Sequence, residues 1–167
     1  NTVFLLLPYC SKGSLRNWLG NVLEGKVKRP GVIRVLSDFK SICEALIVLH
    51  NFQPPYVHQD IKPENVLLDD QNKPLLTDFG SVRKAEIPIK TRKDILQVTE
   101  DAAQFCTASY RSPELYDPPK DITLDTRTDV WAMGCLLFAW WFGYSPFESE
   151  FIGNSIRVTE CSALRVL

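Results

Sequence analysis

The longest regular pattern of apolar and polar residues runs over Val32–His50. Apolar residues recur there at steps of three and four, which is the period of one face of an α-helix. We therefore predict a helix over this range, stopped by the breaker-rich segment Asn51–Pro55. The buried stripe predicted for this helix comprises Ile33, Leu36, Phe39, Cys43, Leu46 and Ile47.

A second strongly apolar segment, Val130–Phe147, contains no charged residue. Its length of about 18 residues is the lower limit for a helix that spans a membrane. Gly134, Gly143 and Pro146 interrupt the segment, so its unbroken helical part is expected to be shorter. We therefore interpret Asp129–Phe142 as a buried helix of a globular domain, with a membrane span as the poorer alternative.

Shorter patterns predict two elements near the start of the chain. Val3–Leu7 is an apolar run that ends at Pro8, as expected of a buried strand. Ser14 is a residue type that begins helices, and the helix it caps is predicted to run through Leu23. The segment Lys26–Gly31 is polar and rich in breakers, and we interpret it as a solvated loop rather than a phosphate-binding patch.

The middle of the chain predicts a hairpin and a further helix. Val66–Leu68 and Pro74–Thr77 have the pattern of short strands joined by the turn-rich segment Asp69–Lys73. Thr91-x-x-Asp94 resembles the capping box that starts a helix, and this helix is predicted to end at about Phe105. Together these patterns predict a fold that is mostly α with small β-hairpins.

The composition is typical of a soluble globular domain. The 167 residues are 45% hydrophobic and 23% charged, which predicts one folded domain and argues against disorder over the whole chain. The formal net charge is −1, so no broad nucleic-acid-binding face is expected and an anionic ligand must be held by local groups. Five cysteines without a C-x-x-C spacing and only two histidines argue against a zinc site and favour reduced thiols.

The residues with the clearest chemistry lie in His58–Asn65, a loop between a long helix and a strand. Asp60 is suited to accept a hydroxyl proton, and Lys62 is suited to neutralise a phosphoryl oxygen. Asn65 can bind a divalent metal ion through its amide oxygen. The triplet Asp78-Phe79-Gly80 follows the second predicted strand, and its carboxylate suits Mg²⁺, which prefers oxygen ligands.

These motifs resemble those of the eukaryotic protein kinases, which carry an H-R-D-L-x-x-x-N loop, D-F-G and A-P-E in that order. This chain has His58-Gln59-Asp60 with Asn65, then Asp78-Phe79-Gly80, then Ser112-Pro113-Glu114. Other phosphotransferases share the first loop. However, Thr107–Glu114 resembles the substrate-docking loop of protein kinases, which small-molecule kinases lack.

Further stretches narrow the resemblance. Asp129–Gly134 is similar to the start of the central buried helix of protein kinases, and Lys62 with Thr107 matches the serine/threonine branch. Glu100–Arg111 and Arg127–Cys135 resemble the Numb-associated kinase family, whose members carry a helix in the activation segment. The helix predicted after the capping box falls in that segment.

The resemblance implies a partial protein kinase domain over residues 1–167, with the larger C-terminal lobe of the kinase fold only. The expected parts are a hinge at 5–13, a catalytic loop at 58–65, an activation segment at 78–114 and a central buried helix at 129–142. The implied location is the cytoplasm, or Golgi membranes through an acylated amino terminus that lies outside these residues. The oligomeric state is left open.

The resemblance also implies the roles of the residues that act on phosphate. Asp60 is the catalytic base, Lys62 steadies the transferred phosphoryl group, and Thr107 contacts both side chains. Asn65 and Asp78 hold two Mg²⁺ ions.

The remaining roles implied by the resemblance concern the base of ATP. Backbone groups of Pro8 and Cys10 face adenine, and Leu67 forms the apolar floor beneath it. His58 and Phe79 belong to an internal column of apolar side chains.

The chain departs from the kinase pattern in two respects. Gln59 replaces an arginine that pairs with a phosphate on the activation segment, so we expect less dependence on such a phosphate; a tolerated surface change is the alternative. The 167 residues contain no glycine-rich nucleotide loop, no Val-Ala-Ile-Lys strand and no helix with its partner glutamate. The carboxy-terminal helices that supply the arginine partner of Glu114 are also expected to be absent. We therefore expect this piece alone to be inactive and marginally stable.

The function predicted for the intact protein is transfer of the γ-phosphoryl group of ATP to a serine or threonine hydroxyl of a protein substrate. The first alternative is a pseudokinase that acts as a scaffold or binding module. Gln59 favours it, whereas the retained Asp60, Asn65 and Asp78 argue against it. The second alternative is a small-molecule kinase.

Overall fold

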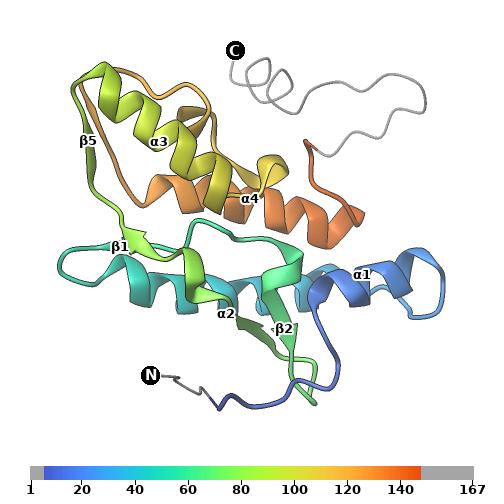
Figure 1. Ribbon diagram of the computed structural model, residues 1–167. Coiled ribbons are helices and arrows are strands. Elements are labelled where there is room, and N and C mark those ends of the chain that lie inside the picture. The colour runs from blue at the N-terminus through green and yellow to red at the C-terminus, as the bar shows by residue number, and fades with distance from the viewer. Residues whose placement is uncertain (1–5, 148–167) are drawn as a thin grey trace, which may run out of the picture.

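The computed structural model of the protein describes residues 6–147 (Figure 1). The α-helices in this range are α1 (Leu15–Leu23), α2 (Val32–His50), α3 (Arg92–Phe105) and α4 (Arg127–Phe142). Short 3₁₀ helices span Pro63–Asn65, Phe79–Ser81, Ala108–Tyr110 and Pro113–Leu115. The strands are β1 (Tyr56–Val57), β2 (Val66–Leu68), β3 (Pro74–Leu76), β4 (Arg83–Lys84), β5 (Ile87–Ile89) and β6 (Ile122–Leu124). The predicted class, mostly α with small β-hairpins, is confirmed.

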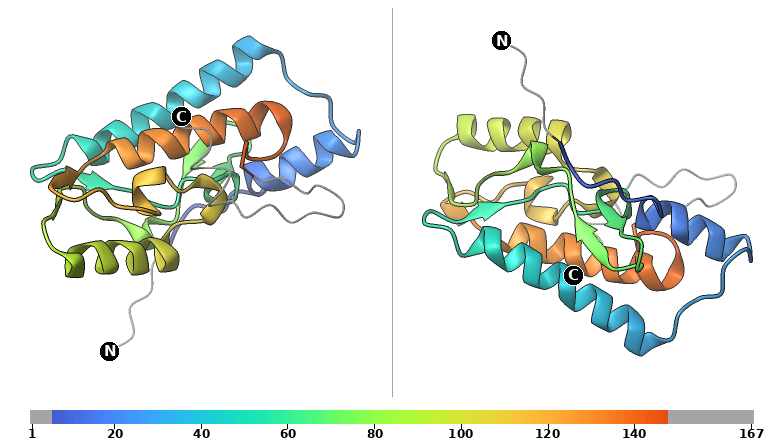
Figure 2. Two further views of the ribbon diagram at one scale, coloured as in Figure 1. Left: turned by 90° about the horizontal axis from the view of Figure 1, so that it is seen from above. Right: turned by 90° about the horizontal axis from the view of Figure 1, so that it is seen from below.

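The strands pair in twos, and the helices surround them. The antiparallel pairs are β1 with β4, β2 with β3, and β5 with β6. Helices α2 and α4 run side by side, and α3 lies on the side of α4 away from α2 (Figures 1 and 2). The main core lies between α2 and α4, where Ile42, Leu136 and Ala139 are fully buried.

Helix α2 has its predicted bounds, but the predicted buried stripe is wrong in part. Ile33, Leu36 and Ile47 are 82%, 51% and 52% exposed, whereas Val35 and Ile42 are buried. The helix carries apolar residues around much of its circumference. More than one set of apolar residues spaced by three and four positions can therefore be drawn on it. Helix α4 and strands β1 and β3 pack against α2, and the part of the helix that they cover decides which pattern is buried.

Helices α1 and α3 begin where their capping residues predict. Ser14 Oγ accepts a hydrogen bond from the Asn17 backbone N–H at 3.3 Å. Thr91 Oγ1 accepts from the Asp94 N–H at 3.2 Å, and Asp94 Oδ2 accepts from the Thr91 N–H at 2.7 Å. These side chains satisfy backbone donors that lack a partner at the start of a helix. Both predicted helix starts are confirmed.

Helix α4 is the predicted buried helix, but it begins two residues before Asp129. Gly134 lies within the helix rather than interrupting it. Gly143 ends the helix with a φ of 94°, a left-handed conformation that favours glycine. Among residues 6–147, no helix has both the length and the apolar character needed to cross a membrane.

The hairpin β2–β3 holds the predicted strands, with Leu67 opposite Leu75, although Thr77 lies just beyond the end of β3. The strand predicted at Val3–Leu7 falls largely on residues 1–5, which lie outside the described residues, as does the first residue of the expected hinge. Leu6 and Leu7 are described, and they are exposed and in irregular backbone, so the strand does not extend to them.

Candidate active site

Asp60 is the centre of a cluster of polar side chains in the loop after β1. Its side chain is 11% exposed. Asp60 Oδ1 accepts hydrogen bonds from Thr107 Oγ1 at 2.6 Å and from the Thr107 N–H at 3.2 Å. Asp60 Oδ2 pairs with Lys62 Nζ at 2.7 Å and accepts from Asn65 Nδ2 at 3.0 Å. All four residues predicted to be catalytic therefore lie together.

Thr107 closes this cluster from the far end of the expected activation segment. Besides donating to Asp60, its hydroxyl accepts a hydrogen bond from Lys62 Nζ at 2.9 Å. The three side chains thus form a triangle in which each contacts the other two. A side chain held by two neighbours loses little further freedom when a substrate binds, which is how such sites gain precision.

The surroundings of Asp60 keep its carboxylate ionised. Burial raises the pKa of Asp60, but hydrogen bonds from Lys62 and Thr107, the Lys62 charge and a hydrogen bond from Asn65 together lower it below the ordinary value. At neutral pH the group is therefore an acceptor of hydrogen bonds only. It is suited to orienting a hydroxyl group toward a reaction partner.

Asp129 at the start of α4 anchors the backbone of the loop that carries Asp60. The sequence did not predict this role. Its two carboxylate oxygens accept hydrogen bonds from the N–H groups of His58 at 2.8 Å and Gln59 at 2.9 Å. His50 Nε2 contacts the same carboxylate at 2.9 Å. Gln59 has a φ of 69°, a strained conformation that this double anchor holds in place. A lone acid directly before the uncharged run of residues 130–142 was the available signal.

Asn65 and Asp78 present oxygen atoms of the type that Mg²⁺ prefers. Asn65 Nδ2 donates to the Asp60 carbonyl at 2.8 Å as well as to its carboxylate, so the amide oxygen remains as an acceptor. The Thr77 N–H donates to the Asn65 carbonyl at 2.9 Å, which places the residue before Asp78 against Asn65. Asp78 is exposed, and its backbone has a left-handed conformation. Its carboxylate accepts a hydrogen bond from the Gly80 N–H at 3.4 Å. One carboxylate and one amide fit Mg²⁺, which takes its remaining ligands from phosphate and water.

The residues expected to contact adenine lie at the β2–β3 hairpin and the segment beside it. The Gly13 carbonyl accepts a hydrogen bond from the Leu68 N–H at 2.9 Å, and Ser14 pairs with Leu67. Leu67 is half-buried there, and the Cys10 carbonyl accepts from the Gly13 N–H at 3.1 Å. Pro8 is exposed.

His58 and Phe79 pack against each other as expected. The His58 ring is fully buried, and its Nε2 contacts the Thr77 carbonyl at 3.0 Å. The centroids of the two rings are 5.5 Å apart. Phe79 is 55% exposed in the described part of the chain.

Comparison with known proteins matches this chain to protein kinases. The family described as protein kinase domain matches residues 1–164. Serine/threonine-protein kinase 16 of Homo sapiens is 38% identical over 164 residues, which cover 98% of this chain and 53% of that protein. Actin-regulating kinase 1 of Saccharomyces cerevisiae is 33% identical over 146 residues, which cover 87% of this chain and 22% of that protein. The chain spans about half the length of the serine/threonine-protein kinase 16 relatives that it matches.

Proposed function

This chain belongs to the protein kinase domain family, and from that premise we propose that the whole protein is a serine/threonine protein kinase. It transfers the γ-phosphoryl group of ATP to a serine or threonine hydroxyl of a protein substrate. The observation that carries the proposal is the triangle of Asp60, Lys62 and Thr107, which holds an ionised carboxylate beside a cation. Curated relatives named serine/threonine-protein kinase support the acceptor class.

The proposed reaction uses the cluster mainly for positioning. Asp60 accepts a hydrogen bond from the substrate hydroxyl and aims its oxygen at the γ-phosphorus. As the new P–O bond forms, the bond to the leaving ADP oxygen breaks and the hydroxyl proton passes to Asp60. Lys62 offsets the charge on the transferred group, and Thr107 keeps both side chains in place. Mg²⁺ bound by Asn65 and Asp78 would supply neutralising charge to the phosphates.

We propose the branch and location as finer statements. Helix α3 within the expected activation segment, together with Glu100–Arg111 and Arg127–Cys135, supports the Numb-associated family. By that resemblance, the protein is cytoplasmic and held at Golgi membranes by an acylated amino terminus. Labelling of the full-length protein in cells with alkyne analogues of myristate and palmitate tests this. Absence of both labels together with a uniform cytosolic distribution would refute the acylation.

The function is tested with the full-length protein, ATP and Mg²⁺, and a general protein acceptor such as myelin basic protein. Asp60→Asn keeps the shape of the side chain but cannot take the proton, so the transfer rate should fall by about 100-fold or more. The matched control Asp117→Asn changes an exposed acid and should leave the rate unchanged. The same assay on residues 1–167 alone is expected to show no transfer.

A pseudokinase is the outcome that would contradict the proposal. In that case the wild-type protein and Asp60→Asn would show the same background transfer, while binding of protein partners would survive the substitution. Phosphorylation of metabolites but of no protein acceptor would instead point to a small-molecule kinase.

A further inference from the structure

The position of α3 decides whether the triangle can form. The helix ends at Phe105, and Thr107 follows two residues later with its hydroxyl and its N–H both on Asp60. Cys106 between them is buried. A connection this short has a reach of only about 7 Å, so a displacement of the end of α3 also displaces Thr107.

Arg83 contacts the last two turns of α3 from the opposite end of the activation segment. Its Nη1 donates to Asp101 Oδ2 at 2.7 Å, and its guanidinium lies 5.0 Å from the centre of the Phe105 ring. The side chains of Arg83 and Asp101 are 22% and 28% exposed. The other Asp101 oxygen accepts from Gln97 Nε2 at 2.8 Å, so both carboxylate oxygens are bound.

Arg83 is in turn fixed to the catalytic loop. It lies on β4, where it pairs with Val57 of β1, and Val57 immediately precedes His58. The backbone of this strand pair and the side chain of Arg83 therefore join α3 to the base of the loop that carries Asp60. The partly buried ion pair with Asp101 and the contact with the Phe105 ring both involve the guanidinium group of Arg83. Each contact therefore helps to keep that group in place for the other.

Gln59 lies beside this contact but supplies no positive charge to it. Gln59 and Arg83 line the same small cavity of about 10 Å³, together with Ala102 of α3. Gln59 is neutral, and its buried Oε1 accepts no hydrogen bond from the residues that the structure describes. The nearby Arg111 uses its guanidinium on the Cys106 carbonyl at 2.9 Å and on the Tyr116 ring. Arg83, and not Arg111, makes the ion pair with Asp101.

We propose that Arg83 is a positioning residue that holds α3 on the catalytic loop through Asp101 and Phe105, so that Thr107 stays on Asp60 without a phosphate on the activation segment. Asp101 supplies as a permanent carboxylate the negative charge that a phosphate would otherwise add. This inference rests on the proposed kinase function for its effect on catalysis. The structural part of the inference, that Arg83 holds α3, does not depend on kinase function.

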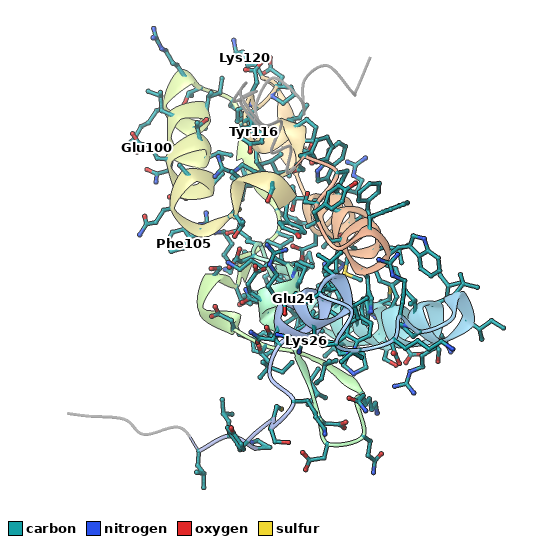
Figure 3. All side chains as sticks on the ribbon, turned by 90° about the vertical axis from the view of Figure 1, so that its right-hand side faces the viewer. Glu24, Lys26, Glu100, Phe105, Tyr116 and Lys120 are labelled. Atoms are coloured by element: carbon teal, nitrogen blue, oxygen red, sulfur yellow. The ribbon has the colours of Figure 1, made fainter. Side chains whose placement is uncertain are left out.

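The test compares Arg83→Gln, Asp101→Asn and the double variant in the full-length protein after phosphatase treatment. The controls are Lys84→Gln and Glu100→Gln, which change exposed charges next to the two partners; Figure 3 shows Glu100 pointing away from the body of the protein. Each variant is assayed for kcat, for KM toward ATP and for hydrogen exchange of the amides in residues 92–105.

The wild-type protein should keep its activity after phosphatase treatment. Each single variant should lose kcat by on the order of tenfold, with KM for ATP unchanged, because Arg83 does not lie among the residues proposed to bind ATP. The double variant should be no worse than either single one, because both remove the same interaction. Arg83→Lys keeps the charge without the planar guanidinium and should restore part of the loss.

Three outcomes would overturn the inference. They are loss of wild-type activity on dephosphorylation, additive losses in the double variant, and unchanged exchange of α3 in both single variants. If the wild-type protein transfers no phosphate, the proposed kinase function is refuted. The exchange measurement still shows in that case whether Arg83 holds α3. Faster exchange of α3 in the variants of an inactive protein would keep the hold of Arg83 and remove only its catalytic consequence.

Discussion

Thr107 is the residue on which the geometry of the candidate site depends most directly. Its hydroxyl donates to Asp60 at 2.6 Å and accepts from Lys62 at 2.9 Å, so one atom orients both charged groups. Hydrogen bonds to charged groups are stronger than those between neutral groups, and loss of either leaves a charged partner free to turn.

Replacement of Thr107 by valine should separate these contacts from the bulk of the side chain. Valine has the same shape but no hydroxyl, so we expect kcat of the full-length protein to fall by about 10- to 100-fold. Thr107→Ser keeps the hydroxyl and should retain most of the activity. Equal rates for the valine and serine variants would show that the hydroxyl does not orient Asp60 and Lys62.

At the scale of elements, α3 begins with a reciprocal cap between Thr91 and Asp94. Hydrogen bonds from the backbone N–H groups of Thr91 and Lys90 lower the pKa of Asp94 below its ordinary value, so its carboxylate is charged at neutral pH. The negative charge lies at the positive end of the helix dipole, where it is favourable. The helix that delivers Thr107 to the site is therefore stabilised at its far end by local contacts.

Thr91→Ala removes half of this cap. We expect the variant to lose about 1 kcal/mol of local stability in α3 because the Asp94 N–H loses its side-chain acceptor. Hydrogen exchange of the first turn of α3 in the full-length protein measures the change. Thr91→Ser restores the acceptor and is the control; if serine is as damaging as alanine, the hydroxyl is not the stabilising group.

At the scale of the whole molecule, the packing of α2 against α4 holds the site together. Leu136 and Ile42 are fully buried between these helices. The same helix α4 carries Asp129, whose carboxylate anchors the backbone of the loop that carries Asp60. A change in how α4 packs therefore changes both the stability of the core and the position of the loop.

Leu136→Ala tests this packing. Removal of a buried leucine side chain leaves a cavity, and we expect a loss of about 2–5 kcal/mol in the free energy of unfolding. Urea unfolding of the full-length protein, followed by tryptophan fluorescence, measures it. The control Leu96→Ala truncates a leucine that is 54% exposed on α3 and should change stability by less than about 0.5 kcal/mol. Equal losses in the two variants would contradict the assignment of the core.

Much of the local structure could be predicted because its causes lie within a few residues. The bounds of α2, the caps of α1 and α3 and the β2–β3 hairpin follow from spacing, capping side chains and turn residues. The chemical character of Asp60, Lys62 and Asn65 is equally a property of the residues themselves. The motif spacing and the family resemblance therefore predicted candidate site residues, and the structure brings Asp60, Lys62, Asn65 and Thr107 together.

The tertiary structure decided what depends on residues far apart in the chain. The resemblance predicted that Thr107 contacts Asp60, but no local pattern could, because 47 positions separate the two residues. Asp129 meets His58 across 71 positions, and this contact was not predicted. The buried face of α2 and the contact of Arg83 with Asp101 likewise depend on which neighbours pack there. Local patterns reflect the period of the backbone and the needs of its N–H groups, whereas these contacts form only when several elements pack together. The sequence by itself therefore determined the elements and their chemistry, and packing determined how the elements meet.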